Sequence, residues 1–211
     1  MKREYSSRKL RQDPLFLRGD YPMIGKYEMP LIKKCDIDAS ALQLIGADKI
    51  RITDTSANIF KAVHFFVEDN KLDRYYNKPQ DYLPRLAQYP HVLTPDYSLY
   101  TDMSMALQIH STFKNRWCGA CWQENGLSVI PSVSWSTEAS YEFCFDGLEY
   151  GTVVAISTVG GLTDKTQFLR GYFEMKKRIN PKQTLCFGKA FAEMEDEVIV
   201  VSYLKTTGRE R

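Results

Sequence analysis

Residues 152–188 read TVVAISTVGGLTDKTQFLRGYFEMKKRINPKQTLCFG, and this stretch decides the fold. Its two ends, Thr152–Thr158 and Gln183–Gly188, are short apolar runs with the composition of buried strands. Between them, Asp164–Ile179 places apolar side chains at helical spacing, and Asn180-Pro181 ends the helix. A strand, a helix and a second strand in this order predict a βαβ unit, whose two strands are parallel.

The same pattern recurs along the chain. Further apolar runs end in a polar residue at His64–Asp69, His91–Asp96 and Val129–Trp135, and Glu197–Leu204 is a last strand. Helices are predicted at Asp81–Tyr89, Met103–Asn125 and Thr137–Phe145. The apolar side of the longest of these is assigned to Met105, Leu107, Ile109, Phe113, Trp117 and Trp122. We therefore expect an α/β domain with a mainly parallel sheet of about five to seven strands flanked by helices, either open or a partial TIM-like barrel.

The N-terminal part of the sequence is less regular. Met1–Lys34 is rich in basic residues, Pro and Tyr, and Asp36–Asp54 has room for one helical turn and a short strand. We predict an N-terminal extension over residues 1–54 and the α/β domain over residues 55–211.

Composition excludes several classes of protein. The chain has 211 residues, 44% of them hydrophobic, and a net charge of +2, so it is not a protein coated in basic residues for nucleic acid. No apolar stretch approaches the roughly 18–20 residues that span a bilayer, and no signal core is present. Five cysteines without a secretory signal indicate reduced thiols. We expect a soluble, cytoplasmic protein without a membrane partner.

The N-terminal eleven residues, MKREYSSRKLR, concentrate positive charge. The basic side chains are those of Lys2, Arg3, Arg8, Lys9 and Arg11. They are candidates for a nucleic-acid-binding arm that contacts phosphates, and the alternative is a solvated terminus.

Two carboxylates follow neighbouring strands of the predicted sheet. Asp69 ends one run and Asp96 ends the next, so they lie close together if the two strands are neighbours. Paired carboxylates can act as acid and base, or hold a divalent cation such as Mg²⁺. The alternative is that each Asp caps the helix after its strand.

Other polar residues are predicted at the same edge as candidate ligand-binding groups. Ser98 follows the Pro95-Asp96 strand exit, and Trp135 ends the next strand, where it either contacts a ligand or closes the core. The strand ending in Ser157 and Thr158 leads through Gly160 and Gly161 into a helix. This loop either binds an anion at the helix N-terminus or is a plain tight turn.

The remaining reactive residues point elsewhere. Trp117–Cys121 reads WCGAC, the spacing of a thioredoxin site, but it falls late in a helix and not at a helix N-terminus. Zinc binding would need Cys144 or Cys186 as further ligands, so buried packing is the better account of the pair. His64 and His91 open their predicted strands, at the end of the sheet away from the site.

Several segments resemble a known family. PDYSLY at residues 95–100, WQENG at 122–126 and VAIST at 154–158 followed by Gly-Gly are similar to the family catalogued as domain of unknown function 4417, which occurs in bacterial genomes, phages and other mobile elements. The resemblance covers about Val63 to Gly188. The matching positions are Asp69, Pro95, Asp96, Ser98, Gln123, Asn125, Gly126, Pro131, Trp135, Asp146, Gly147, Ser157, Thr158 and Gly160. It implies an accessory protein of a phage or mobile element and specifies no activity.

Two hypotheses for function follow. The first is a phage or mobile-element protein that binds, and processes if it is an enzyme, a nucleotide or nucleic acid at the carboxyl edge of the sheet, with a divalent cation such as Mg²⁺ as its candidate cofactor. The second is a non-catalytic module that binds a host protein, in which case the strand-end residues are structural.

Overall fold

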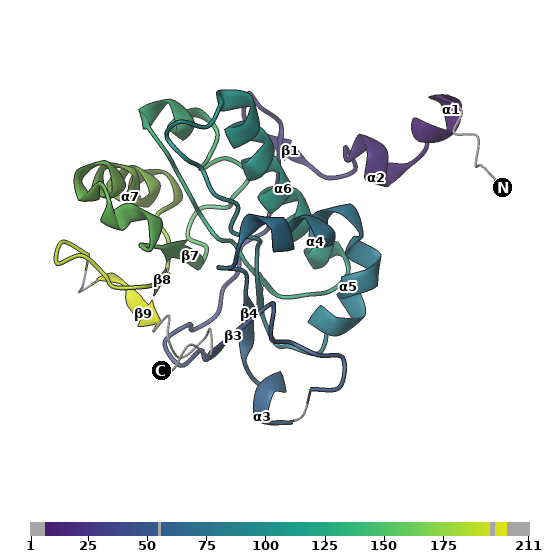
Figure 1. The fold of residues 1–211 in the computed structure, drawn as a ribbon, viewed down its shortest axis with the longest axis horizontal. Coiled ribbons are helices and arrows are strands. Elements are labelled where there is room, and N and C mark those ends of the chain that lie inside the picture. Colours follow the sequence, from purple (N-terminus) through teal and green to yellow (C-terminus); the bar gives the residue numbers. More distant parts are fainter. Residues whose placement is uncertain (1–6, 55, 195–196, 202–211) are drawn as a thin grey trace.

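The computed structural model describes residues 7–54, 56–194 and 197–201. Strands β3 to β9 are parallel to their neighbours and follow one another in chain order (Figure 1). One sheet consists of β3 (Leu44–Gly46), β4 (Ala62–His64), β5 (Val92–Leu93) and β6 (Val129–Ile130). A second sheet consists of β7 (Val154–Ser157), β8 (Thr184–Phe187) and β9 (Ile199–Val201). An antiparallel pair, β1 (Met23–Ile24) and β2 (Met29–Pro30), lies outside both.

The two parallel sheets meet at an isolated bridge between Ser132 and Ala155. There the amide of Val133 donates to the Ala155 carbonyl at 2.8 Å, and the Ala155 amide donates to the Pro131 carbonyl at 2.9 Å. Thr94 extends the pairing of β5 with β6, because its hydroxyl accepts from the Ser132 amide at 2.7 Å. The strands therefore form one layer in the order β3 to β9.

Helices pack on the outer side of this layer: α4 (Asp73–Asn77), α5 (Pro79–Leu86), α6 (Met105–Glu124) and α7 (Lys165–Ile179). The short helix α3 (Ser56–Ile59) lies apart from them, at the bottom of Figure 1. The 3₁₀ turns η1 (Asp69–Lys71), η2 (Glu138–Glu142) and η3 (Gly160–Leu162) accompany the helices. Helix α7 ends at Asn180, which adopts a left-handed conformation with φ of 44°, and Pro181 follows. None of the helices in the described residues has the length and hydrophobicity needed to cross a membrane.

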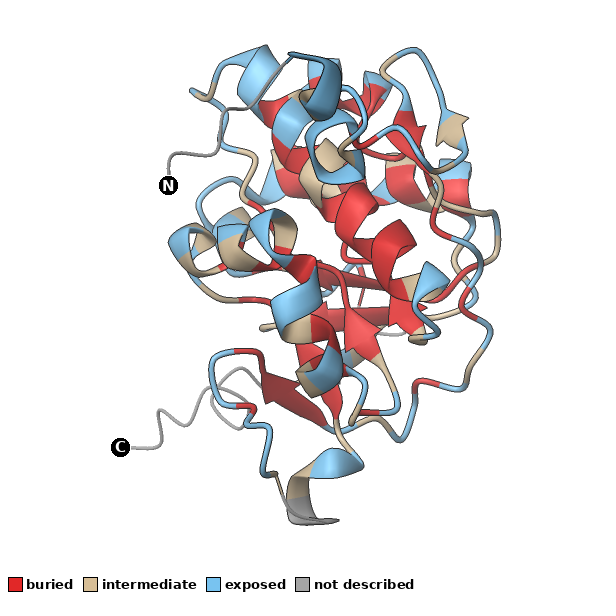
Figure 2. Cartoon of the chain, turned by 90° about the vertical axis from the view of Figure 1, so that its right-hand side faces the viewer, coloured by how far each residue is buried: buried red, intermediate tan, exposed pale blue. Residues whose placement is uncertain are grey.

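Hydrophobic side chains form an inner core and two outer cores. The inner core is shared by strands from both sheets and includes Leu44, Ala62, Leu93, Ile130, Ala155, Leu185 and Phe187. One outer core lies between the first sheet and α4 to α6, and the other lies between the second sheet and α7. Figure 2 shows buried residues running along the strands and the facing side of α6. Because residues from β3 to β8 meet in one inner core, the layer is curved like part of a barrel.

The curved layer does not close. Among the described residues no pairing joins β9 to β3, so both remain edge strands. The expectation of a mainly parallel α/β sheet, open or partly barrel-like, is confirmed.

Three details of the predicted elements are wrong. The run His64–Asp69 is not a strand: β4 is Ala62–His64, and the chain leaves the sheet after His64. His64 therefore ends its strand instead of opening it. The predicted helix Thr137–Phe145 is the 3₁₀ turn η2. In both segments the apolar residues are buried as expected, but the buried residues extend beyond those that form a regular strand or helix.

The predicted apolar side of α6 is also partly wrong. Met105 and Leu107 are exposed, with 38% and 56% of their surface accessible. The buried side of the same turns is polar and consists of Gln108, Ser111, Thr112, Asn115 and Arg116. Towards the C-terminal end of α6, Trp117 and Trp122 are buried as predicted.

The N-terminal segment reaches both into the sheet and away from it. β3 falls within residues 1–54 and pairs with β4, so the predicted extension supplies an edge strand, while the division at residue 54 stays a prediction. Helices α1 (Ser7–Leu10) and α2 (Pro14–Leu17) project from the body (Figure 1). The Arg18 guanidinium anchors this arm, because it stacks over the rings of Tyr76 at 3.7 Å and Trp117 at 4.1 Å.

Candidate functional site

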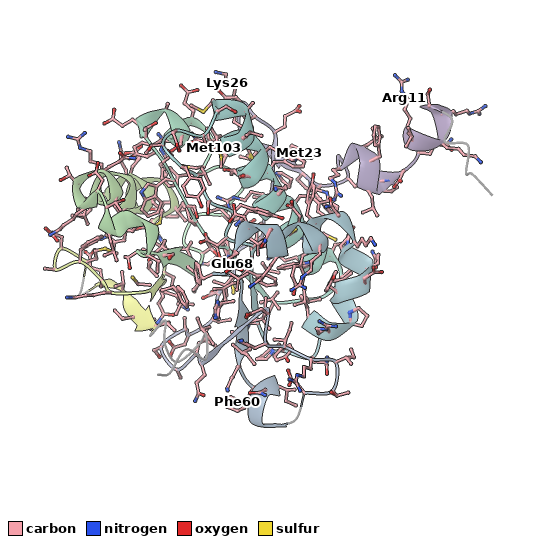
Figure 3. The ribbon with its side chains drawn as sticks, viewed as in Figure 1. Arg11, Met23, Lys26, Phe60, Glu68 and Met103 are labelled. Carbon is pink, nitrogen blue, oxygen red and sulfur yellow. The ribbon has the colours of Figure 1, made fainter. Side chains whose placement is uncertain are left out.

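Asp69 holds the loop that follows β5. It is the first residue of η1, next to Glu68, which Figure 3 labels near the centre of the molecule. Its carboxylate accepts from the Ser98 hydroxyl at 3.0 Å and from the Ser98 amide at 3.2 Å. Both side chains are half-buried, so the carboxylate has a fixed orientation and remains in contact with solvent.

Asp96 makes the equivalent contact one strand further along the sheet. It lies just beyond β5, and its carboxylate accepts from the Ser134 hydroxyl at 2.5 Å. Ser134 follows β6, so each carboxylate is held by a serine from the next strand exit. The predicted alternative, in which Asp69 and Asp96 cap helices, is not what the structure shows, because the partners of both carboxylates are serines in loops.

The two carboxylates are close enough to influence each other. Burial raises the pKa of Asp96 to about 6, and the negative charge of Asp69 contributes to the increase, while the hydrogen bond from Ser134 opposes it. The expectation that the strand exits bring these two residues together therefore agrees with the electrostatics. Near neutral pH the edge carries two negative charges that a cation would stabilise.

This raised pKa predicts a pH-dependent stability. A carboxyl group whose pKa is higher in the folded state than its ordinary value near 4 stabilises the fold below about pH 4, and the contribution is lost as pH rises through about 6. Asp96→Asn cannot ionise, so between pH 4.5 and pH 8 we expect it to gain about 2 kcal/mol of unfolding free energy relative to wild type. Urea unfolding at both pH values measures this, with exposed Asp102→Asn as the control; a constant difference would contradict it.

The next strand exit contributes further hydroxyl groups. Ser134 and Ser157 each lie two residues beyond the bridging pair Ser132 and Ala155. The Ser157 hydroxyl accepts from the Val159 amide at 3.3 Å, and the buried Thr158 hydroxyl donates to the Phe187 carbonyl at 3.4 Å. Ser157 and Thr158 therefore lie at the predicted edge, and their hydroxyls take part in the local turn.

The Gly160-Gly161 loop has a packing role that the sequence did not reveal. A Cβ atom on Gly161 would lie 2.3 Å from Cδ2 of Phe168, so this position needs glycine for close contact. The N-terminus of α7 is already capped, because Asp164 accepts from the Gln167 amide at 3.0 Å. An anion at this end of α7 would have to compete with the negative charge of Asp164.

Trp135 lies in the outer core that packs against α7. Its indole N–H donates to the Phe168 carbonyl at 3.2 Å, and its ring lies 4.9 Å from that of Phe168. On the other side it covers Gly171, where a Cβ atom would approach Cδ1 to 2.1 Å. Its polar group is thus satisfied within the protein, which agrees with the core-closing alternative.

The predicted basic arm is only partly described. Arg8, Lys9 and Arg11 are exposed on and just after α1, and Arg11 is labelled on the projecting arm in Figure 3. Lys2 and Arg3 lie outside the described residues. Figure 3 shows Arg11 on the projecting arm and Glu68, the neighbour of Asp69, near the centre of the molecule, so the arm and this carboxylate do not form one site.

The cysteines are packing residues. All five are free and buried, and burial raises the pKa of Cys118 and Cys121 in α6. Across the described ranges, no group of three or more His, Cys, Asp or Glu side chains is arranged to hold a metal ion. A cation at the strand edge would therefore have Asp69 and Asp96 as its carboxylate ligands, with hydroxyls and water completing the shell.

The sequence interpretation missed several residues near this edge. His64 lies inside the curved sheet, with its ring 4.9 Å from that of Phe187. A small polar cavity lies beside Ser134 and is lined mainly by α6 residues and the segment that follows β6. The signal for it was present in the sequence, because the polar residues Gln108, Ser111, Thr112 and Asn115 recur at helical spacing.

Fold and site together define an α/β protein with a parallel sheet and a group of carboxylates and hydroxyls at the carboxyl ends of its strands. The chain belongs to the family described as "Domain of unknown function (DUF4417)", whose model matches residues 21–204. This range is wider than the resemblance over residues 63–188 and leaves α1 and α2 outside it.

Two phage proteins are similar to the chain. The Gene 1 protein of Mycobacterium phage L5 is 35% identical over 180 residues, which are 84% of this chain and 78% of that protein. The Gene 1 protein of Mycobacterium phage D29 is 33% identical over 180 residues, which are 84% of this chain and 66% of that protein. No solved structure matches the chain.

Proposed function

We propose that this phage-family protein binds a nucleotide or nucleic acid at the carboxyl edge of its sheet, with a divalent cation such as Mg²⁺ held between Asp69 and Asp96. The observation that carries the proposal is that two half-buried carboxylates follow neighbouring strands at the same edge, each held by a serine of the next strand exit. A divalent cation would remove their repulsion and would itself attract phosphate oxygens.

The two serines support this role. Ser98 and Ser134 each donate a hydrogen bond to one carboxylate, so each carboxylate is held in place and retains further acceptor sites for a metal. If the bound molecule is processed without a cation on Asp96, this residue is the better candidate for proton transfer, because its pKa of about 6 lies close to neutral pH.

Thermal unfolding with added ligands tests the proposal. Mg²⁺, Mn²⁺, adenine and guanine nucleotides and a single-stranded oligonucleotide are compared for the wild type and for Asp69→Asn/Asp96→Asn. A ligand at 100 times its Kd adds about 2.7 kcal/mol, which raises the Tm of a chain of this size by roughly 5–10 °C. We expect this increase in wild type with a divalent cation and nucleotide, and little or none in the double variant.

A matched control separates the site from general charge effects. Asp20→Asn/Asp102→Asn removes the same number of charges from exposed positions, so its response should equal that of wild type. An unchanged Tm of folded wild type across all ligands would contradict the proposal.

The N-terminal arm is tested with the oligonucleotide. Deletion of residues 1–11 should reduce the salt dependence of binding, because the slope of log K against log salt concentration decreases by about 0.7 for each single-strand phosphate that the protein no longer neutralises.

A second candidate function is a protein-binding module that acts on a host protein. The observation that favours it is the α2 turn, where Leu15, Phe16 and Leu17 are 38%, 59% and 55% exposed and lie before the family match begins. If this module is the function, Asp69→Asn/Asp96→Asn retains all activity in the phage or host, whereas replacing the three apolar residues of α2 abolishes it.

A further inference from the structure

A small polar cavity lies beside Ser134, the partner of Asp96, between α6 and the segment that follows β6. Its lining consists of Tyr97, Leu99, Ser111, Thr112, Asn115, Arg116, Ser132 and Ser134. Ser134 is shared with the candidate site, because its hydroxyl donates to Asp96. The cavity has about 10 Å³ of space for the centre of a water-sized group, which is room for one oxygen atom.

One hydroxyl group of this lining has no partner among the described residues. Thr112 is 4% exposed, yet its Oγ1 makes no hydrogen bond. Folded proteins rarely leave a buried hydroxyl unsatisfied without a bound water, ion or ligand group. The Thr112 hydroxyl is therefore free to donate to an acceptor atom in the cavity.

The electrostatics of the wall favour a negatively charged acceptor. Arg116 is 1% exposed, and within the described part of the chain it forms no ion pair. Its guanidinium donates to the carbonyls of Asp146 at 2.9 Å, Cys144 at 2.6 Å and Ser132 at 3.2 Å, and to Oδ1 of Asn115 at 2.5 Å. Burial lowers the pKa of Arg116 to about 10, and the charge of Asp146 opposes this, so the guanidinium stays positive near neutral pH and would stabilise an anionic oxygen in the cavity.

This cavity fits a phosphate oxygen better than the glycine loop does. Asp164 already caps α7, and Phe168 packs against Gly161, so that loop has neither a free helix end nor open backbone at its second glycine. The cavity instead presents a cation, the Thr112 hydroxyl without a partner and the nearby serines. It also lies next to Asp96, where the proposed cation would bind the remaining oxygens of the same group.

We propose that this cavity is an oxyanion subsite that takes one oxygen of a phosphate group through Thr112 and Arg116. The assignment rests on the proposed function for the identity of the ligand, because the phosphate would belong to the nucleotide held at Asp69 and Asp96. The part of the nucleotide that this side of the site would recognise is a phosphate oxygen.

Inorganic phosphate without any divalent cation tests the subsite alone. The Tm is measured against phosphate concentration at constant ionic strength, in the presence of a chelator, for wild type, Thr112→Val and Thr112→Ser. Phosphate should raise the Tm of wild type and of Thr112→Ser, which keeps the hydroxyl. Thr112→Val should bind phosphate about tenfold more weakly, the effect of removing one hydrogen bond to a charged group. Thr163→Val, at an exposed threonine, is the matched control and should behave as wild type.

Each outcome has a definite meaning. No response of wild type to phosphate, an equal response of Thr112→Val and wild type, or an equal response of wild type to chloride would overturn the subsite. If Thr112→Val does not fold, the subsite is still tested by comparing the effects of phosphate and chloride on the Tm of wild type and of Thr112→Ser. Failure of the proposed function gives a different result. In that case Mg²⁺ has no effect on the Tm that depends on Asp69 and Asp96, while the effect of phosphate still depends on Thr112.

Discussion

Replacing Arg116 with methionine is expected to lower the free energy of unfolding by about 3–4 kcal/mol. The methionine fills similar space, but the carbonyls of Cys144 and Asp146 lose the donors that Arg116 provides, and so does Oδ1 of Asn115. Each buried acceptor left without a donor costs about 1–3 kcal/mol, and the relief of burying a charge offsets part of the sum. Urea unfolding at pH 7 measures the change.

Arg170→Met is the matched control for this prediction. Arg170 is exposed and its contact with Glu138 is 3.8 Å long, so its replacement should change stability by less than about 0.5 kcal/mol. If Arg116→Met were as stable as wild type, the hydrogen bonds of Arg116 would be less important to the fold than its burial suggests.

Gly171→Ala is expected to destabilise the protein by about 2–3 kcal/mol although alanine favours a helix. The added Cβ would lie 2.1 Å from Cδ1 and 2.2 Å from Nε1 of Trp135, so the indole has to move. Movement of the ring breaks its hydrogen bond to the Phe168 carbonyl and overpacks the outer core. The roughly 1 kcal/mol that alanine gains over glycine in a helix is smaller than this loss.

Gly160→Ala is the control for this second prediction. A Cβ atom at Gly160 meets nothing within 4 Å, so we expect a change of at most about 0.5 kcal/mol in unfolding free energy. Tryptophan fluorescence of Gly171→Ala should also shift, since Trp135 changes its surroundings. A stable Gly171→Ala with unchanged fluorescence would show that α7 moves away without cost.

The sequence predicted the layer of parallel strands because the strands are short apolar runs between helices. It misplaced β4, because the apolar residues that follow His64 are buried without pairing to a neighbouring strand. Phe65 faces an outer core and Phe66 faces the inner core, so both are buried after the strand has ended. Alternation of apolar residues cannot distinguish these two situations.

The carboxylate edge was predicted from the sequence, and the cavity beside it was missed. Asp69 and Asp96 follow from a general property of parallel sheets, that the carboxyl ends of neighbouring strands meet at one edge. The cavity depends on the polar buried side of α6, where Ser111, Thr112 and Arg116 face strand exits that are themselves polar. A search for an apolar helix face assigns polar residues to the solvent-exposed side of a helix. It therefore predicted exposure for residues of α6 that the structure buries.

The join between the two sheets has a mechanical consequence. Where the backbone pairing reduces to the Ser132–Ala155 bridge, only two hydrogen bonds of a ladder are made among the described residues, from the Val133 amide to the Ala155 carbonyl and from the Ala155 amide to the Pro131 carbonyl. Such bonds are easier to break one at a time than a continuous ladder, so this join is the compliant line along which the molecule would bend. A molecule that binds at the carboxyl edge across this line would stiffen the whole protein, and part of its binding free energy would be spent in doing so.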